Sequence, residues 1–386
     1  MPGFADRMRG FPPYPLADVP ELKRRLAAEG VDVIDLGAGD ADLAPPPAAV
    51  RALLDAAAEP AMGRYGFQLG LPAFREAIAR WMAERFGVDV DPYREALPLI
   101  GSKEGIAHLA LACVNPGDVT VVPDPGYQPY VGGTLLAGGE PHLVPLRPEN
   151  DFLIPFGELP ETVVRRTRIV YLNYPNNPTA ATAPREYLAE AVEFCRAHGA
   201  LLAYDNAYSE IAFEGYRPPS ILEIDGARDV AIEFHSLSKT YNMTGWRIGW
   251  AVGGAETIAA LARVKSFVDT GAFLAVQAAA AAALASHAAW VPGNVAAFQE
   301  RRDALVDALC ANGFQAARPR ATMYVWVPVP GGRGSEEFAR RALLEQGVVI
   351  MPGAALGAGG EGFLRLALTK GPERLREAAT RLGRLL

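Results

Sequence analysis

The sequence predicts an α/β fold, in which a large domain with a mostly parallel sheet is joined to a smaller α+β domain. Short β-branched runs alternate with longer helical stretches along most of the chain, which is the pattern of parallel strands joined by crossover helices. The predicted strands end in Pro, Gly, Ser or Asn, as is typical of strands that feed loops at one edge of a sheet. A length of 386 residues is enough for two domains, or for one large domain with a smaller companion.

The strands of the large domain are predicted from short apolar runs rich in β-branched residues. Their ranges are 119–122, 142–146, 168–173, 200–204, 230–234 and 247–252. Helices are predicted at 72–86 and 184–198, where apolar residues recur at helical spacing and a glycine follows the last turn. The alanine-rich segment 275–289 is predicted to form a buried helix.

The smaller domain is predicted from the patterns at the two ends of the chain. A long amphipathic helix from about Asn294 leads out of the large domain. The elements that follow are a β-rich stretch at 322–328, a helix from Ser335, strands at 348–351 and 363–368, and a helix after Pro372. A short strand at 34–36 adds the first residues to this domain. We therefore predict a large domain at 46–293 and a small domain made of 1–45 and 294–386.

Composition limits the expected partners and compartment. The net charge of −7 is mild and no dense Lys/Arg block could track phosphates, so nucleic acid is not an expected partner. The first residues lack the apolar core of a signal peptide, and the apolar run 278–285 is too short to span a bilayer. The three cysteines are far apart and show no metal spacing. We expect a cytoplasmic protein with no membrane partner and no bound metal.

A lysine with a candidate phosphate cradle follows the predicted strand 230–234. Ser236 and Ser238 alternate before Lys239, and Arg247 comes soon after. Two serines and an arginine that converge on one lysine describe a phosphate site beside a nucleophilic amine. A surface lysine after a strand is the alternative, but the flanking apolar residues and glycines favour a desolvated amine that can form a Schiff base.

Asp205 directly follows the apolar run 200–204. A carboxylate at the end of a buried strand is costly unless it pairs with a cation, and a protonated pyridine nitrogen is such a cation. A helix cap or a loop carboxylate is the alternative. Tyr208 lies three residues later, so a helical turn here would direct both side chains into one pocket.

Four further positions carry candidate contacts at strand and helix ends. The turn 173–179 closes a strand, and an asparagine amide there can address a phenolate oxygen and a carboxylate. Ser102 and Lys103 open a helix after a glycine, where free N–H groups favour phosphate. Tyr127 can stack on a planar cofactor, and Arg365 in an apolar strand fits a substrate carboxylate. An ordinary turn, a capped helix start and an internal salt bridge are the alternatives.

In this order, the Asn-Asn-Pro-Thr, Asp-x-x-Tyr and Ser-x-Ser-Lys motifs and the downstream arginine resemble class I aminotransferases of the fold-type-I pyridoxal-phosphate family. The resemblance runs from Ile34 to Arg365. It implies a three-layer αβα large domain with a mostly parallel, seven-stranded sheet. It also implies transamination between an amino acid and a 2-oxo acid, with pyridoxal 5′-phosphate as cofactor and a homodimer with shared active sites.

The resemblance implies catalytic roles for three residues and cofactor contacts for others. Lys239 would bind the cofactor and later shuttle the proton, Asp205 would keep the pyridine nitrogen protonated, and Tyr127 would stack on the ring. Tyr208 and Asn177 would address the phenolic oxygen. The implied phosphate contacts are Ser102, Lys103, Ser236, Ser238 and Arg247, with Tyr65 reaching the phosphate of the neighbouring subunit. The implied α-carboxylate contacts are Arg365, Asn177 and the backbone at Gly39.

Within that family, the Gly-Ser-Lys-Glu-Gly and Asp-Pro-Gly-Tyr motifs look most like LL-diaminopimelate aminotransferases and relatives that act on alanine, aspartate or glutamate. Tyr14 stands where that branch has a substrate-contacting tyrosine. Two departures concern the distal end of the substrate. Ala41 replaces a usual proline, and the stretch 270–275 is apolar where some diaminopimelate enzymes have an amide.

The expected reaction pairs glutamate and 2-oxoglutarate with LL-diaminopimelate, alanine or aspartate. A pyridoxal-phosphate C–S β-lyase is the alternative enzyme, since it would use the same lysine and the same ring. A non-catalytic ligand-sensing module on the same fold is disfavoured, because no basic helix-turn-helix pattern precedes Ile34.

Overall fold

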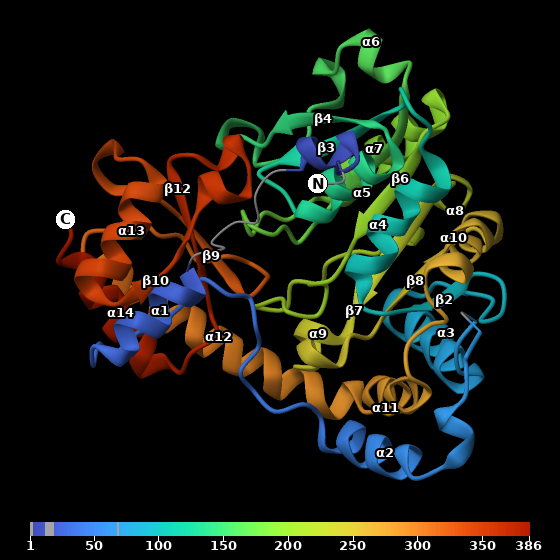
Figure 1. The fold of residues 1–386 in the computed structure, drawn as a ribbon, viewed down its shortest axis with the longest axis horizontal. Helices are drawn as coiled ribbons and strands as arrows, with labels where there is room; N and C mark the ends of the chain where they lie inside the picture. The colour runs from blue at the N-terminus through green and yellow to red at the C-terminus, as the bar shows by residue number, and fades with distance from the viewer. Residues whose placement is uncertain (1–2, 12–18, 68) are drawn as a thin grey trace.

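The structure is a computed structural model that describes residues 3–11, 19–67 and 69–386, and its largest feature is a seven-stranded sheet (Figure 1). The strand order is β2-β8-β7-β6-β5-β3-β4. The strands are β2 (Ala96–Leu99), β3 (Val119–Asp124), β4 (Glu140–Pro145), β5 (Thr167–Leu172), β6 (Leu201–Asp205), β7 (Ala231–Ser236) and β8 (Gly249–Gly253). All neighbours pair in parallel except β8, which is antiparallel to β7 and β2.

Strand β2 is absent from our six predicted ranges, and Pro98 explains why. A proline cannot donate to a strand ladder, so the sequence Ala-Leu-Pro-Leu argues against a central strand. In the structure β2 lies at the edge of the sheet and pairs with β8 alone, and an edge position tolerates a missing donor. The expected seven-stranded, mostly parallel sheet is therefore confirmed. Its seventh strand is β2, which the proline in its sequence made hard to predict.

Helices cover both faces of this sheet and make a three-layer αβα arrangement. Along β5, Ile169 and Tyr171 face one hydrophobic core while Val170 and Leu172 face another, as the two-residue period of a strand requires. The first face is covered by α4 (Ser102–Cys113), α5 (Gln128–Ala137) and α10 (Ala255–Val268). The second is covered by α3 (Pro72–Phe86), α7 (Arg185–His198) and α11 (Leu274–Ala285), with α2 (Pro47–Ala57) packed outside α11.

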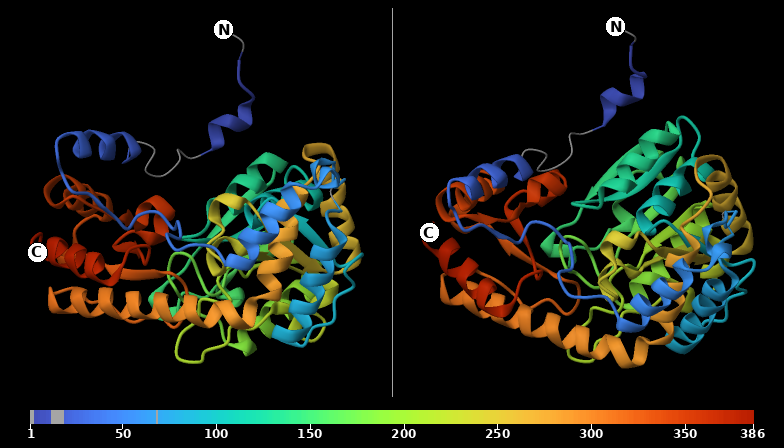
Figure 2. Two further views of the ribbon diagram at one scale, coloured as in Figure 1. Left: turned by 90° about the horizontal axis from the view of Figure 1, so that it is seen from below. Right: turned by 60° about the horizontal axis from the view of Figure 1, so that its bottom comes forward.

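The remaining β-strands form two small sheets beside the large one. They are β1 (Ile34–Asp35) paired with β10 (Val348–Val349), and the antiparallel order β11 (Met351–Pro352), β12 (Phe363–Ala367), β9 (Tyr324–Pro328). Helices α1 (Val19–Ala28), α12 (His287–Ala311), α13 (Ser335–Gln346) and α14 (Pro372–Gly383) surround them. Helix α12 runs from the large sheet to the small ones (Figure 2). The domain boundaries at residues 46 and 294 stay a prediction.

Four predicted elements need correction. The alanine-rich helix ends at Ala285 and not at 289, and α12 begins at His287 and not near Asn294, because the chain bends by 82° between them. The predicted strand 348–351 is two short strands, β10 and β11, that belong to different sheets. Strand β8 begins after Arg247, whose positive φ of 55° takes it out of extended conformation.

The described residues also form three short α-helices, α6 (Glu161–Val164), α8 (Ala227–Val230) and α9 (Leu237–Thr240), and several short 3-10 helices. Over the described ranges, no single helix is long and apolar enough to cross a membrane. Helices α11 and α12 reach that length and apolarity only when taken together across their bend.

Candidate active site

A cavity of about 530 Å³ opens where the carboxyl ends of the parallel strands meet the small sheets. Loops after β2, β3, β5, β6 and β7 reach this edge, and the antiparallel β8 begins there. Twelve of the predicted site residues line it: Gly39, Ser102, Lys103, Tyr127, Asn177, Asp205, Tyr208, Ser236, Ser238, Lys239, Arg247 and Arg365. Tyr65 is not part of this lining and is 69% exposed, while Tyr14 lies outside the described residues.

Asp205 lines this cavity, and its two carboxylate oxygens differ in their contacts. Its Oδ2 accepts a hydrogen bond of 2.8 Å from the buried Tyr130 hydroxyl on α5, whose ring stacks on Tyr171. Its Oδ1 is buried without a hydrogen-bond partner among the described residues. Burial raises the pKa of Asp205 to about 6, although the bond from Tyr130 opposes the rise. A cationic N–H donor at Oδ1 would satisfy this atom.

Helix α9 and the start of α4 form a cradle beside Lys239. The Ser236 hydroxyl caps α9 by accepting a bond of 3.1 Å from the Ser238 backbone N–H. The Arg247 guanidinium lies 3.4 Å from the Ser238 hydroxyl oxygen. A Cβ at Gly101 would lie 2.3 Å from Arg247 Nη2, so only glycine lets the arginine lie across the start of α4. Hydroxyls, a guanidinium and a helix N-terminus together suit a phosphate dianion.

A chain of hydrogen bonds joins the strand ends to Arg365. The Asn173 amide donates to the Asp205 backbone carbonyl at 2.6 Å and accepts from the Asn177 backbone N–H at 2.7 Å. The Asn177 side-chain oxygen in turn accepts from Arg365 at 2.8 Å. Arg365 also donates to the Gly37 carbonyl at 2.7 Å. The guanidinium is therefore held in one orientation at the cavity wall, as bidentate recognition of a carboxylate requires.

Three residues of this site were not predicted from the sequence. Asn173 was predicted only as part of a turn, and no role was predicted for the hydroxyls of Tyr130 and Tyr324. The Tyr324 hydroxyl lies in the cavity 3.3 Å from that of Tyr208. Both tyrosines lie in apolar stretches of a helix or a strand, where an aromatic residue is ordinarily part of the core.

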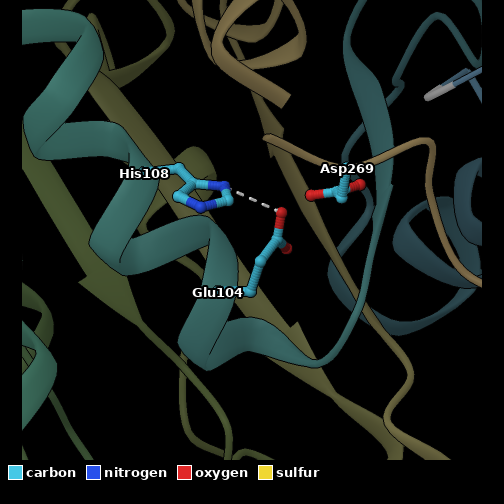
Figure 3. Close-up of side chains that lie close together, drawn as sticks. All are labelled: Glu104, His108 and Asp269. Atoms are coloured by element: carbon cyan, nitrogen blue, oxygen red, sulfur yellow. Dashed lines mark hydrogen bonds and ion pairs between the residues drawn. The ribbon is translucent and has the colours of Figure 1, made fainter. Parts of the chain in front are cut away.

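A partly buried cluster of ionisable side chains lies beside the first turns of α4 (Figure 3). Glu104 lies between His108, which it contacts at 3.0 Å, and Asp269. The fully buried Lys265 ammonium bonds Glu104 and lies 3.1 Å from both Asp269 oxygens. Burial raises the pKa of Asp269, but the charge and hydrogen bonds of Lys265 together with the bond from the Gly271 backbone N–H outweigh it, so the pKa lies below its ordinary value. Since a bonded ammonium already supplies positive charge there, we interpret the cluster as structural.

Comparison with known proteins identifies the family. A family model described as aminotransferase class I and II matches residues 31–382. The chain belongs to this family. An LL-diaminopimelate aminotransferase of Desulforudis audaxviator is 51% identical over 98% of this chain and 96% of its own length.

Solved structures agree with this assignment. A probable N-succinyldiaminopimelate aminotransferase from Thermus thermophilus superposes with a TM-score of 0.90, at 41% identity over 95% of this chain and 99% of that one. The Thermus thermophilus aspartate aminotransferase with maleate superposes with a TM-score of 0.92, at 31% identity over the full length of both chains. This chain is therefore a pyridoxal-phosphate-dependent aminotransferase of the α/β fold type I.

The residues present fit that cofactor. The partnerless Asp205 oxygen suits a protonated ring nitrogen, and the cradle at Ser238 and Arg247 suits a phosphate. When bound, pyridoxal phosphate supplies the electron sink that stabilises negative charge at the substrate Cα. The chain supplies the rest: Lys239 Nζ, which bonds the Gly39 carbonyl, is an amine that can accept and return a proton, and Arg365 can fix the substrate carboxylate.

Proposed function

We propose that this aminotransferase exchanges the amino group of LL-diaminopimelate with 2-oxoglutarate, giving glutamate. The observation that carries the proposal is 51% identity to an LL-diaminopimelate aminotransferase over nearly the whole of both chains. A second such relative, from Moorella thermoacetica, is 48% identical over 99% of this chain. The substrate class needs an α-amino acid site, and the oriented Arg365 beside Lys239 meets that need.

In this proposal Lys239 binds the cofactor and moves the proton at the substrate Cα. Asp205 accepts from the ring nitrogen, Tyr127 stacks on the ring, and Tyr208 with Asn177 addresses its phenolic oxygen. The phosphate contacts are Ser102, Lys103, Ser236, Ser238 and Arg247. The substrate α-carboxylate contacts Arg365, Asn177 and the backbone at Gly39. The support is geometric, since all these residues line one cavity.

We further propose a homodimer in which Tyr65 completes the site of the partner subunit. Tyr65 and Phe67 are 69% and 66% exposed, and their rings lie 5.8 Å apart. Phe267 and Phe273, at 87% and 51%, precede Leu274, whose side chain lies next to Gly66 in the Tyr65 loop. Exposed aromatic rings of this size are typical of a surface that a second copy covers.

The test is the visible spectrum of the purified protein with cofactor, recorded after each of several amino acids is added separately. LL-diaminopimelate and glutamate should each bleach the yellow band, and 2-oxoglutarate should restore it. Alanine or aspartate bleaching the band in place of LL-diaminopimelate would overturn the substrate. Release of pyruvate, ammonia and a thiol from a cystathionine-like amino acid, without an oxo-acid acceptor, would instead favour the C–S β-lyase. A Lys239→Ala control should show none of these changes.

A further inference from the structure

Tyr324 is a central residue of the cavity to which the proposed function gives no role. It lies at the start of β9, on a small sheet, yet its side chain reaches residues of the large domain. Its side chain is almost completely buried and lines the same cavity as Lys239.

The Tyr324 hydroxyl touches two residues of the site. It lies 3.3 Å from the Tyr208 hydroxyl, and the two rings meet edge to face with centroids 5.7 Å apart. A Cβ at Gly39 would lie 2.0 Å from this oxygen, so the glycine leaves the space that the hydroxyl occupies. The Gly39 carbonyl accepts from Lys239 Nζ. The Tyr324 oxygen is thus wedged between the phenol and the backbone that contacts the lysine.

The guanidinium of Arg365 packs against the face of the Tyr324 ring. The Arg365 Cζ atom lies 4.3 Å from the ring centroid, within the range of a cation–π interaction. Burial raises the pKa of Tyr324, but the charges of Arg365 and Lys239 together with the hydrogen bond to Tyr208 outweigh it, so the pKa lies below its ordinary value. Burial also raises the pKa of Tyr208, well above its ordinary value. Either hydroxyl can donate across the 3.3 Å contact, but the proposed function directs the Tyr208 proton to the cofactor, so the Tyr208 oxygen is left to accept from Tyr324.

We propose that Tyr324 is a positioning residue with two tasks: its hydroxyl donates to the Tyr208 oxygen, and its ring seats Arg365 for the substrate carboxylate. The Tyr208 proton is then directed at the cofactor. This inference rests on the proposed function, which places Tyr208 beside the phenolic oxygen of the cofactor.

The first task has a spectroscopic consequence. A phenol that accepts one hydrogen bond becomes a stronger donor in the next, because hydrogen bonds in a chain polarise one another. When Tyr208 donates more strongly to the phenolic oxygen of the cofactor, that oxygen becomes less basic. It then attracts the proton on the cofactor nitrogen that is bonded to Lys239 less strongly. That nitrogen then loses its proton at a lower pH.

Tyr324→Phe in the holoenzyme removes the hydroxyl and keeps the ring. The midpoint of the titration of visible absorbance against pH should rise by about half a pH unit. A whole ordinary hydrogen bond would change this midpoint by roughly one pH unit, and only part of one is lost at the cofactor. The KM for glutamate should change less than about twofold, because the seat of Arg365 remains. Tyr324→Leu removes the ring as well, and its KM should rise roughly tenfold.

Tyr187→Phe is the matched control. It also loses a buried hydroxyl, one bonded to the Ile154 backbone away from the cavity lining, so it should lose stability and keep the wild-type midpoint. A midpoint for Tyr324→Phe equal to wild type, or an equal KM for the Phe and Leu variants, would overturn this inference alone. A wild-type holoprotein without a visible band would refute the proposed function, and this inference with it.

Discussion

The carboxyl group of Asp205 is buried at the end of β6, where its pKa of about 6 exceeds the ordinary value of 3.8. The folded, cofactor-free protein holds this proton more tightly than the unfolded chain does. Stability is therefore lost as the pH rises from about 4 to about 6, and the carboxylate costs roughly 3 kcal/mol above that range. The cofactor would offset this cost by bringing a cation to the partnerless oxygen.

Asp205→Asn removes the cost, because an amide does not ionise. We expect the cofactor-free variant to melt at a higher temperature than wild type at pH 7, to match it near pH 4, and to bind the cofactor more weakly. Thermal melting of both cofactor-free proteins between pH 4 and pH 8 measures the difference. If the difference in melting temperature between variant and wild type is the same at pH 4 and pH 8, the buried carboxyl group is not the source of that difference.

At this scale the sequence predicted the residues whose chemistry is unusual for their place, such as a carboxylate at a strand end or an arginine within an apolar strand. Asp205 and Arg365 stand out for that reason. Tyr130 and Tyr324 do not, since a tyrosine among apolar residues is an ordinary core residue. Their function depends on where the hydroxyl points, and only the packed structure shows that.

Among the elements, the start of α4 depends on one glycine. Gly101 has a φ of +73°, and a methyl group there would collide with the Arg247 guanidinium. Gly101→Ala should therefore displace the arginine and weaken cofactor binding at least tenfold, measured as the cofactor Kd, because a charge-assisted contact to phosphate is lost.

Gly87→Ala provides the control at the end of α3. Gly87 has a similar φ of +68°, but within the described residues a Cβ there would meet no heavy atom closer than 4 Å. This variant should have the same backbone strain as Gly101→Ala and bind the cofactor with wild-type affinity. Equal weakening by both alanines would mean that strain, and not the arginine, controls binding.

Helices and strands were predicted well where their hydrophobic periodicity is strong. They were predicted poorly where contacts with neighbouring elements determine the structure. The β-branched runs of the central strands and the helices that end at Gly87 and Gly199 follow local rules. Strand β2 forms by pairing with β8 at the edge of the sheet. The helix break at Ser286 accompanies the change of direction from α11 to α12. Neither cause is present in the local sequence.

For the whole molecule, the exposed aromatic surface at Tyr65, Phe67, Phe267 and Phe273 is the proposed dimer face. Phe267→Asp should shift the protein towards monomers in analytical ultracentrifugation, since burying a carboxylate in an apolar interface is costly. Cofactor occupancy should fall with it, because Tyr65 would no longer reach the partner.

Leu344→Asp on α13 is the comparison, since Leu344 is 42% exposed on a different element. We expect this variant to sediment as wild type does. Dimers that persist in Phe267→Asp and dissociate in Leu344→Asp would place the interface elsewhere.

Lys239 is the residue that we propose to hold pyridoxal phosphate. The most direct test of this role is borohydride reduction of the holoprotein, followed by proteolysis and mass spectrometry of the peptides. We predict the mass of the reduced cofactor on the peptide that contains Lys239, and its disappearance from that peptide in Lys239→Ala. The same mass on a peptide with another lysine, or on no peptide of a protein that has turned yellow, would contradict the account.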